Sequence, residues 1–171
     1  MRGFLLVVTV LVALLAIFAV AMLPDRHVGS RSVHFSQPPE FIWHAVADVE
    51  NSPAWRPDLK EVSQLPDRDS HPVWRESYSD GSVIVLETSE SVPMRRLVRR
   101  TVETSLPFAS AWTVDIVPAG DGCTVTVTED RRIRNAVVRF IGRFVNGRGP
   151  TVDRYIEALG QRLGEPVHPL P

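Results

Sequence analysis

Lysine and cysteine are almost missing from this sequence of 171 residues. Cys123 is the single cysteine, which excludes a disulfide framework and a cysteine-based metal site within the chain. Lys60 is the single lysine among 19 basic residues, and this excess of arginine is more typical of GC-rich codon usage than of a binding signal. With 20 acidic residues the formal net charge is -1, which argues against a general nucleic-acid-binding protein. The length fits one domain with its own hydrophobic core.

The common catalytic motifs are also missing. The sequence has no Gly-x-Ser-x-Gly elbow, no His-Glu-x-x-His pair and no phosphate-binding glycine loop. Four of the five histidines, His34, His44, His71 and His168, are scattered along the chain. None of these lies at the spacing from other ligands that a metal site needs, so we expect no metal and no redox cofactor. A catalytic carboxylate would have to be Glu76 or Glu87, whose pKa burial would raise toward neutrality.

One long uncharged run, Phe4 to Leu23, stands at the start of the chain. Its 20 positions, at about 1.5 Å each, span roughly the 30 Å of a bilayer core. We expect residues 1–24 to be a single-pass membrane anchor and residues 25–31 to be a linker. The alternative is a cleavable signal peptide ending near Ala19-Val20-Ala21, but the hydrophobic region of such peptides usually has only about 7 to 15 residues.

Orientation in the membrane follows from the flanks of this run. Three residues precede it, which favours export of the domain to the periplasmic or extracellular side. One arginine, Arg2, precedes the run, whereas Arg26 and Arg31 follow it. Because basic residues favour the cytoplasmic side, a domain on that side stays open as an alternative.

A short helix and a sharp bend are predicted after residue 37. Pro38 and Pro39 suit the first positions of a helix, and apolar residues then recur at helical spacing, namely Phe41, Ile42, Ala45, Val46 and Val49. Residues 51–57 contain two prolines and cannot continue this helix. We therefore expect two short helical segments with Trp55 at the bend between them and the next strand.

Seven stretches have the composition or the alternation of β-strands. They are residues 32–36, 59–65, 71–79, 82–92, 95–104, 110–118 and 123–132. Turns are predicted at residues 66–69, at Asp80-Gly81 and at residues 120–122. Alternation places Trp74, Glu76 and Tyr78 on one face of their strand. The last two strands, joined by a glycine turn, should be antiparallel neighbours.

The end of the chain has a helical pattern in two parts. In the first part Val137, Ile141, Phe144 and Val145 share one face. Residues 146–150 interrupt the pattern, and Thr151 can cap a second part with apolar residues at helical steps, namely Val152, Tyr155, Ile156, Leu159 and Leu163. Residues 166–171 are expected to be a loose tail.

This order of elements resembles the helix-grip fold of the SRPBCC (START/Bet v 1-like) superfamily, and within it the polyketide cyclase/dehydrase and lipid-transport-like group. The resemblance is carried by Pro39 to Asp48, by Ser52 to Pro57 and by Val73-Trp74-Arg75-Glu76. It covers Val33 to Gly164 and implies that residues 32–165 form an α+β domain whose curved antiparallel sheet wraps around a long C-terminal helix. It also implies an apolar cavity that binds a lipid or another hydrophobic molecule. The interruption at residues 146–150 departs from the continuous helix of the family.

Face parity selects the residues that would line such a cavity. They are Trp55, Trp74, Glu76, Tyr78, Leu97, Arg99, Trp112, Val114, Val125, Val127, Phe144, Tyr155 and Leu159. The alternative is that these residues simply fill a core, because aromatic side chains dominate cores as well as pockets. If Glu76 and Arg99 both point inward, they could pair with each other or hold the polar end of a ligand.

Arginines cluster toward the end of the chain, at Arg131, Arg132, Arg134, Arg139, Arg143 and Arg148. Glu129, Asp130 and Asp153 lie near them in the sequence, which favours a solvated, charge-balanced face. The alternative is contact with anionic lipid headgroups beside the anchor.

Three hypotheses for the function follow. The first is a membrane-anchored helix-grip domain that binds a hydrophobic small molecule or lipid. The second is an enzyme of the cyclase or dehydratase kind that uses a cavity carboxylate such as Glu76. The third is a domain without a cavity that binds protein partners in the cell envelope; the sequence does not identify such partners.

Overall fold

The computed structural model describes residue 4 and residues 25–102, 106–133, 135 and 151–167. Within these ranges seven strands form one antiparallel sheet in the order β1-β7-β6-β5-β4-β3-β2. The elements are β1 (Arg26–Phe35), α2 (Pro39–Ala47), the 3-10 helix η1 (Ser52–Ala54), β2 (Leu59–Arg68), β3 (His71–Tyr78), β4 (Val83–Val92), β5 (Arg96–Thr101), β6 (Phe108–Ala119), β7 (Gly122–Ile133) and α4 (Thr151–Leu163). This is the predicted α+β helix-grip arrangement.

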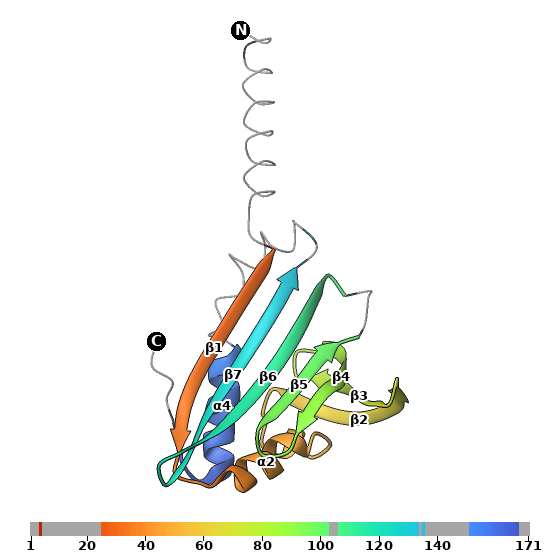
Figure 1. Cartoon of the computed structure of the whole chain (residues 1–171). Helices are drawn as coiled ribbons and strands as arrows, with labels where there is room; N and C mark the ends of the chain where they lie inside the picture. Colours follow the sequence, from red (N-terminus) through yellow and green to blue (C-terminus); the bar gives the residue numbers. More distant parts are fainter. Residues whose placement is uncertain (1–3, 5–24, 103–105, 134, 136–150, 168–171) are drawn as a thin grey trace.

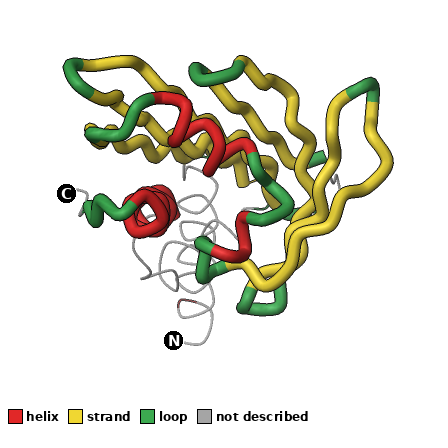
Figure 2. Tube along the Cα trace, turned by 90° about the horizontal axis from the view of Figure 1, so that it is seen from below, coloured by secondary structure: helices red, strands yellow, loops and turns green. Residues whose placement is uncertain are grey.

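The sheet is strongly curved, and its helices lie on the concave side (Figures 1 and 2). α4 packs against β1 and β7, and α2 crosses the lower end of the sheet, where it contacts β6 and α4. In the view from below, α4 is seen end-on in the hollow side of the sheet, with α2 and η1 beside it (Figure 2). The two helices and η1 therefore cover the concave face of the sheet.

The alternation predicted for the last two strands is present. Val114 and Ile116 of β6 pair in register with Val127 and Val125 of β7, and all four side chains are buried. Cys123 follows the same face and is also buried. Apolar residues of α4 cover this part of the sheet and form one core with it. Side chains of successive strand residues point to opposite faces. The alternation of apolar and polar residues therefore predicted both the strands and the face that is buried.

Strand β1 begins at Arg26 rather than at Ser32, so the predicted linker of residues 25–31 is wrong. β1 pairs with β7 without a break from Arg26 to Phe35. The convex face of this pairing is polar: the hydroxyl groups of Ser30 and Ser32 lie 2.9 and 2.7 Å from those of Thr128 and Thr126. A strand that buries so little apolar surface in its first half lacks the alternation by which sequence reasoning finds strands.

Strand β2 also continues further than predicted. It runs through Pro66 to Arg68, and the turn is made by Asp69 and Ser70 instead of residues 66–69. Both turn residues have positive φ, 49° and 66°, as in the type I′ turns that suit hairpins. Pro66 is tolerated because β2 is an edge strand and its register shifts between Leu65 and Arg68.

The expected loose tail is ordered at its start. Val167 packs against the hydrophobic core, and the side chain of Glu165 accepts a hydrogen bond of 2.8 Å from the backbone N–H of Ser36. This segment passes close to Gly160 of α4: a Cβ at that position would lie 2.7 Å from the carbonyl oxygen of Glu165. Glycine is needed there because the backbone of the tail leaves no room for a side chain.

Several predictions fall outside the described residues. They concern the anchor at residues 5–24, the helix at residues 136–145, the interruption at residues 146–150 and the tip of the tail at residues 168–171. Across the described part of the chain, no helix has the length and apolar character that crossing a bilayer requires.

Candidate functional site

Two charged side chains meet on the concave face of the sheet. Glu76 lies on β3 and Arg99 on β5, and the curvature of the sheet brings them together across β4. Arg99 Nη1 donates a hydrogen bond of 2.5 Å to Glu76 Oε1, and both side chains are at least nine-tenths buried. The pairing that their face parity suggested is therefore present, between residues far apart in the sequence.

A second buried arginine, Arg56, approaches the same carboxylate. Its Nη1 lies 3.8 Å from Glu76 Oε2, and its Nε and Nη2 donate to the two carboxylate oxygens of Asp58 at 3.3 and 2.7 Å. The bend positions this side chain, because the backbone N–H of Arg56 closes the turn onto the carbonyl of Ser52 at 2.9 Å. Sequence reasoning missed Arg56 and Asp58, since a bend has no periodicity. The only signal was a pair of opposite charges on either side of Pro57.

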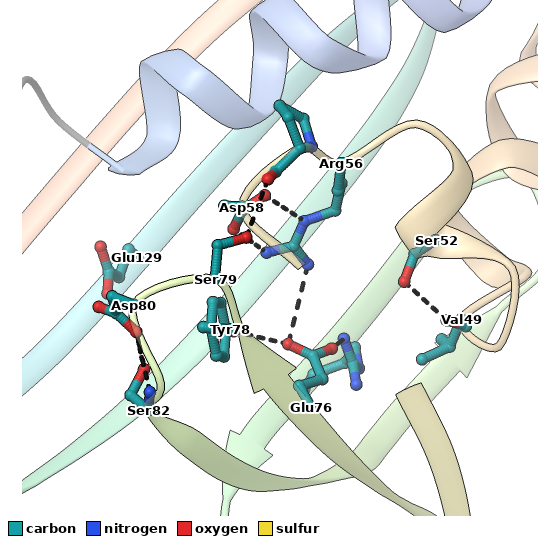
Figure 3. A network of polar contacts seen from close by, with 12 residues as sticks. Val49, Ser52, Arg56, Asp58, Glu76, Tyr78, Ser79, Asp80, Ser82 and Glu129 are labelled. Carbon is teal, nitrogen blue, oxygen red and sulfur yellow. Dashed lines mark hydrogen bonds and ion pairs between the residues drawn. The ribbon is translucent and has the colours of Figure 1, made fainter. Parts of the chain in front are cut away.

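Tyr78 completes the arrangement. Its hydroxyl donates a hydrogen bond of 2.6 Å to Glu76 Oε2. The hairpin after Tyr78 is tied to the bend, because the N–H of Ser79 donates to the carbonyl of Asp58 at 2.9 Å. Figure 3 shows Glu76 at the centre, with Tyr78 and Arg56 directed toward it from different segments. We call Arg56, Asp58, Glu76, Tyr78 and Arg99 the Glu76 network.

The pKa of Glu76 is lowered, which corrects the expectation that burial would raise it toward neutrality. Burial does act in that direction, but the positive charges of Arg99 and Arg56 and the hydrogen bond from Tyr78 outweigh it. Glu76 is therefore an anion at neutral pH. The other candidate, Glu87, is only half-buried and pairs in register with Val73 on the opposite face of the sheet, so it does not reach this site.

The neighbouring phenols stay protonated. Burial raises the pKa of Tyr78 well above its ordinary range, and the nearby anion of Glu76 raises it further. Burial likewise raises the pKa of Tyr155 to about 12, although Arg56 and Arg99 act in the opposite direction. Burial by itself would lower the pKa of Arg56, but Glu76 and Asp58 raise it above its ordinary value. At neutral pH the network thus consists of two arginine cations, two carboxylates and the neutral phenol of Tyr78, and the neutral phenol of Tyr155 lies beside it.

Aromatic rings border the network on the side of α4. The ring of Tyr155 meets those of Trp55 and Trp112 edge-on, each at a centroid distance of 5.3 Å. The guanidinium of Arg56 lies over the ring of Tyr155, 5.4 Å from its centroid, in cation–π geometry. The charged groups are therefore surrounded by large, weakly polar surfaces.

Arg99 has unused hydrogen-bonding capacity. Its Nε and Nη2 atoms are buried and have no hydrogen-bond partner among the described residues. Arg31 Nε and Asp153 Oδ1 also lack hydrogen-bond partners by geometry, but they face each other in an ion pair of 3.0 Å. Arg131 Nε also lacks a hydrogen-bond partner, but its side chain is one-third exposed. Arg99 therefore stands out, as an arginine more than nine-tenths buried with two free donors.

The other predicted lining residues divide into three groups. Val114, Val125, Val127 and Leu159 are buried in the hydrophobic core, with Tyr155 at its border with the network. Leu97 belongs to the same core and, with Trp74, lies on the wall of a hollow. Phe144 lies outside the described residues. That these residues line a ligand cavity stays a prediction.

Two open hollows are formed by described residues. One, of about 650 Å³, lies between α2, η1 and the end of α4, with Trp55 on its wall. The other, of about 310 Å³, is bounded by the residues after α2, the β2–β3 turn and β4, and its wall includes Trp74, Thr88 and Leu97. Thr88 is the register partner of Arg99, and Leu97 precedes Arg99 on the same face of β5. The smaller hollow is therefore lined by sheet neighbours of Arg99, while no member of the Glu76 network is on its wall.

The clustered arginines that the structure describes have acidic partners. Arg131 pairs with Glu129 at 2.5 Å and Arg132 with Asp25 at 3.5 Å. The remaining arginines of the cluster, at positions 134, 139, 143 and 148, lie outside the described residues. Within the described ranges, no three His, Cys, Asp or Glu side chains gather as a metal site would need.

Comparison with protein families matches residues 26–164 to the family of polyketide cyclase / dehydrase and lipid transport proteins. This range covers every described strand and helix from β1 to α4. A search of the curated proteins finds no match.

Solved structures share the fold at low sequence identity. Norcoclaurine synthase from Thalictrum flavum superposes with a TM-score of 0.63 at 11% identity, over 82% of this chain and 87% of the enzyme. A START superfamily protein from Mycobacterium smegmatis gives 0.61 at 19% identity, over 81% and 97% of the two chains. A protein from Thermobifida fusca gives 0.57 at 22% identity, over 82% and 97%. At such identities the likeness establishes the helix-grip fold.

Proposed function

The chain belongs to the family of polyketide cyclase / dehydrase and lipid transport proteins, and we propose that it binds a hydrophobic small molecule between the concave face of its sheet and α4. The binding region extends from the smaller hollow, past Thr88, to the Glu76 network. Its apolar walls are Trp74 and Leu97 on the sheet side, and the aromatic border formed by Trp112 and Tyr155 lies toward α4.

The Glu76 network is the observation that carries this proposal. Removing charges from water costs several kcal/mol for each ion, roughly, and replacement of a buried ion pair by apolar residues is often neutral or stabilising. A network of Glu76, Arg56 and Arg99 inside the fold is therefore poorly explained by stability. It is well explained by the need to orient a ligand that is otherwise apolar, because pockets of this kind use a few convergent polar groups for that purpose.

Acid–base catalysis is less well supported. A general acid or base works best with a pKa near the working pH. Glu76 instead has a lowered pKa, and its two oxygens already accept hydrogen bonds from Arg99 and Tyr78. These contacts suit a residue that holds arginines in place.

Tethering to a membrane is part of the same proposal. We infer that the uncharged run from Phe4 to Leu23 anchors the chain, with the domain on the exported side of the membrane. Protease added to intact cells or spheroplasts should then cleave the domain while cytoplasmic proteins survive. Protection of the domain until the membrane is opened would reverse the proposed orientation.

Native mass spectrometry of the full-length protein, released from detergent micelles, tests the binding function. We expect an apolar molecule bound in a one-to-one ratio, identifiable after solvent extraction. As a second readout, the neutral probe N-phenyl-1-naphthylamine should bind and become fluorescent. A protein that carries no molecule and ignores the probe would contradict the proposal and favour a role in binding protein partners.

A further inference from the structure

The chemical class of the ligand can be read from Arg99. Its Nη1 is used by Glu76, whereas Nε and Nη2 are buried and lack partners among the described residues. A buried donor without an acceptor has lost its hydrogen bonds to water without replacement, and this is more unfavourable when the group is charged. Two such donors on one side chain indicate that an acceptor from outside the chain belongs next to them.

The two free nitrogens specify the shape of that acceptor. Nε and Nη2 lie on the same edge of the planar guanidinium and present two parallel N–H groups. This is the edge with which arginine binds both oxygens of a carboxylate at once. A lone carbonyl or hydroxyl oxygen could meet the two donors only in one shared, poorly aligned contact, whereas two oxygens of one group pair with both.

The charge of the interior favours the same group. The three most buried charged side chains are Glu76, Arg99 and Arg56, with side-chain exposures of 1%, 9% and 11%. Asp58, the second carboxylate of the network, is 35% exposed and is partly screened by water. Counting Asp58, which is hydrogen-bonded to Arg56, the whole network is neutral, but its three deepest groups, two cations and one anion, still attract an anionic ligand.

The surroundings of Arg99 define the rest of the molecule. Its register partners are Thr88 on β4 and Trp112 on β6, and Leu97 lies beside it on the same face. None of these side chains is charged, and the hollow beside them has Trp74 on its wall. Resting on the proposed binding function, we propose that the ligand is an apolar carboxylic acid whose carboxylate is held by the free Nε–Nη2 edge of Arg99.

Titration of the full-length protein with dodecanoic acid labelled with ¹³C at the carboxyl carbon tests this assignment, with methyl dodecanoate as the neutral counterpart. We expect the acid to bind at least about tenfold more tightly than the ester, because each charge-assisted hydrogen bond is worth more than a neutral one. The bound carboxyl carbon should also titrate at a lower pH than that of the free acid.

Three variants connect the preference to Arg99. Arg99→Gln should bind acid and ester equally, and Glu76→Gln combined with Arg99→Gln should do the same without leaving a buried charge unpaired. Arg99→Lys retains the charge but loses the two-donor edge, so part of the preference should disappear. Arg100→Gln is the matched control, because this exposed arginine is the next residue on β5 and points to the opposite face.

The possible outcomes separate the two proposals. Equal binding of acid and ester by the unmodified protein, or an acid preference that survives in Arg99→Gln, would overturn the carboxylate assignment and leave the binding function standing. Failure to bind either compound, together with an empty protein in native mass spectrometry, would remove both. Loss of the preference in Arg99→Gln and in the double variant, but not in Arg100→Gln, would support the assignment.

Discussion

The concave face of the sheet has two halves of opposite chemistry. Toward β1, β7 and β6 it is apolar, with Val114, Val125 and Val127 packed under α4. Toward β5, β4 and β3 it includes Glu76, Thr88 and Arg99, and the other buried polar side chains of the described residues, Ser52 and Arg56, lie close by in η1 and the bend. The side chains named in both halves are buried. The comparison indicates that the first half holds the fold together and the second half serves binding.

Removal of the central carboxylate should have the largest effect. Glu76→Ala leaves Arg99 and Arg56 without their shared partner, and loss of one member of a buried ion pair costs about 3 to 5 kcal/mol. Equilibrium urea unfolding of the full-length protein measures this loss. Glu61→Ala, at an exposed position on the neighbouring strand β2, should stay within about 0.5 kcal/mol. Equal effects of the two substitutions would show that the network is not coupled to the fold.

Truncation in the apolar half tests the other side of the comparison. Leu159 of α4 is fully buried, so Leu159→Ala removes apolar contacts and leaves a cavity at a cost of about 2 to 5 kcal/mol. Val117→Ala, on a side chain that is mostly exposed, should change the free energy of unfolding by less than about 0.5 kcal/mol. If Leu159→Ala were as mild as this control, the half under α4 would not be the stabilising core.

Removal of the Tyr78 hydroxyl should lower the free energy of unfolding by a smaller amount. Tyr78→Phe keeps the ring but removes the hydrogen bond to Glu76, and a hydrogen bond to a charged group is worth about 1.5 to 3 kcal/mol. The same unfolding experiment measures it. In the Glu76→Gln background the loss should shrink toward that of a neutral hydrogen bond, and an unchanged loss would mean that Tyr78 acts through something other than the carboxylate.

Acid should weaken the fold through Glu76. The pKa of this group is below its ordinary value of 4.5 in the folded protein, so the unfolded chain takes up the proton first as the pH falls. The stability due to the ionised carboxylate is complete above pH 4.5 and is lost as the pH falls through the folded pKa. Asp130, whose pKa Arg26 also lowers, contributes to the acid dependence of stability in the same direction. The part due to Glu76 is therefore measured by comparing the unmodified protein with Glu76→Gln. A variant with the same acid dependence as the unmodified protein would contradict this assignment.

Much of the fold could be predicted from the sequence, because the strands next to the core alternate strictly. Val125 and Val127 separated by threonines fix both the strand and its buried face. The start of β1 could not be found in this way, since Ser30 and Ser32 are satisfied by hydroxyl groups of β7 rather than by burial. Pro66 was read as a turn because the edge position that tolerates it is a property of the assembled sheet.

The candidate site was only partly predictable for a related reason. Face parity brought Glu76 and Arg99 to the same side of the sheet, and their contact followed from the strand order. Arg56 comes from a bend, where no period indicates direction, and its guanidinium reaches the site only after the chain has turned at Ser52. The predicted direction of the pKa shift of Glu76 was wrong because burial alone was considered, whereas the charges of Arg99 and Arg56 and the hydrogen bond from Tyr78 outweigh it.

The double variant Glu76→Met with Arg99→Met tests the central claim most directly. It replaces the buried ion pair by apolar side chains and leaves Arg56 its partner Asp58. We predict a protein that is as stable as the original, or about 1 to 4 kcal/mol more stable, but that has lost its bound molecule in native mass spectrometry. A variant that retains the molecule at full occupancy, or one that no longer folds, would contradict the claim that this half of the sheet serves binding rather than stability.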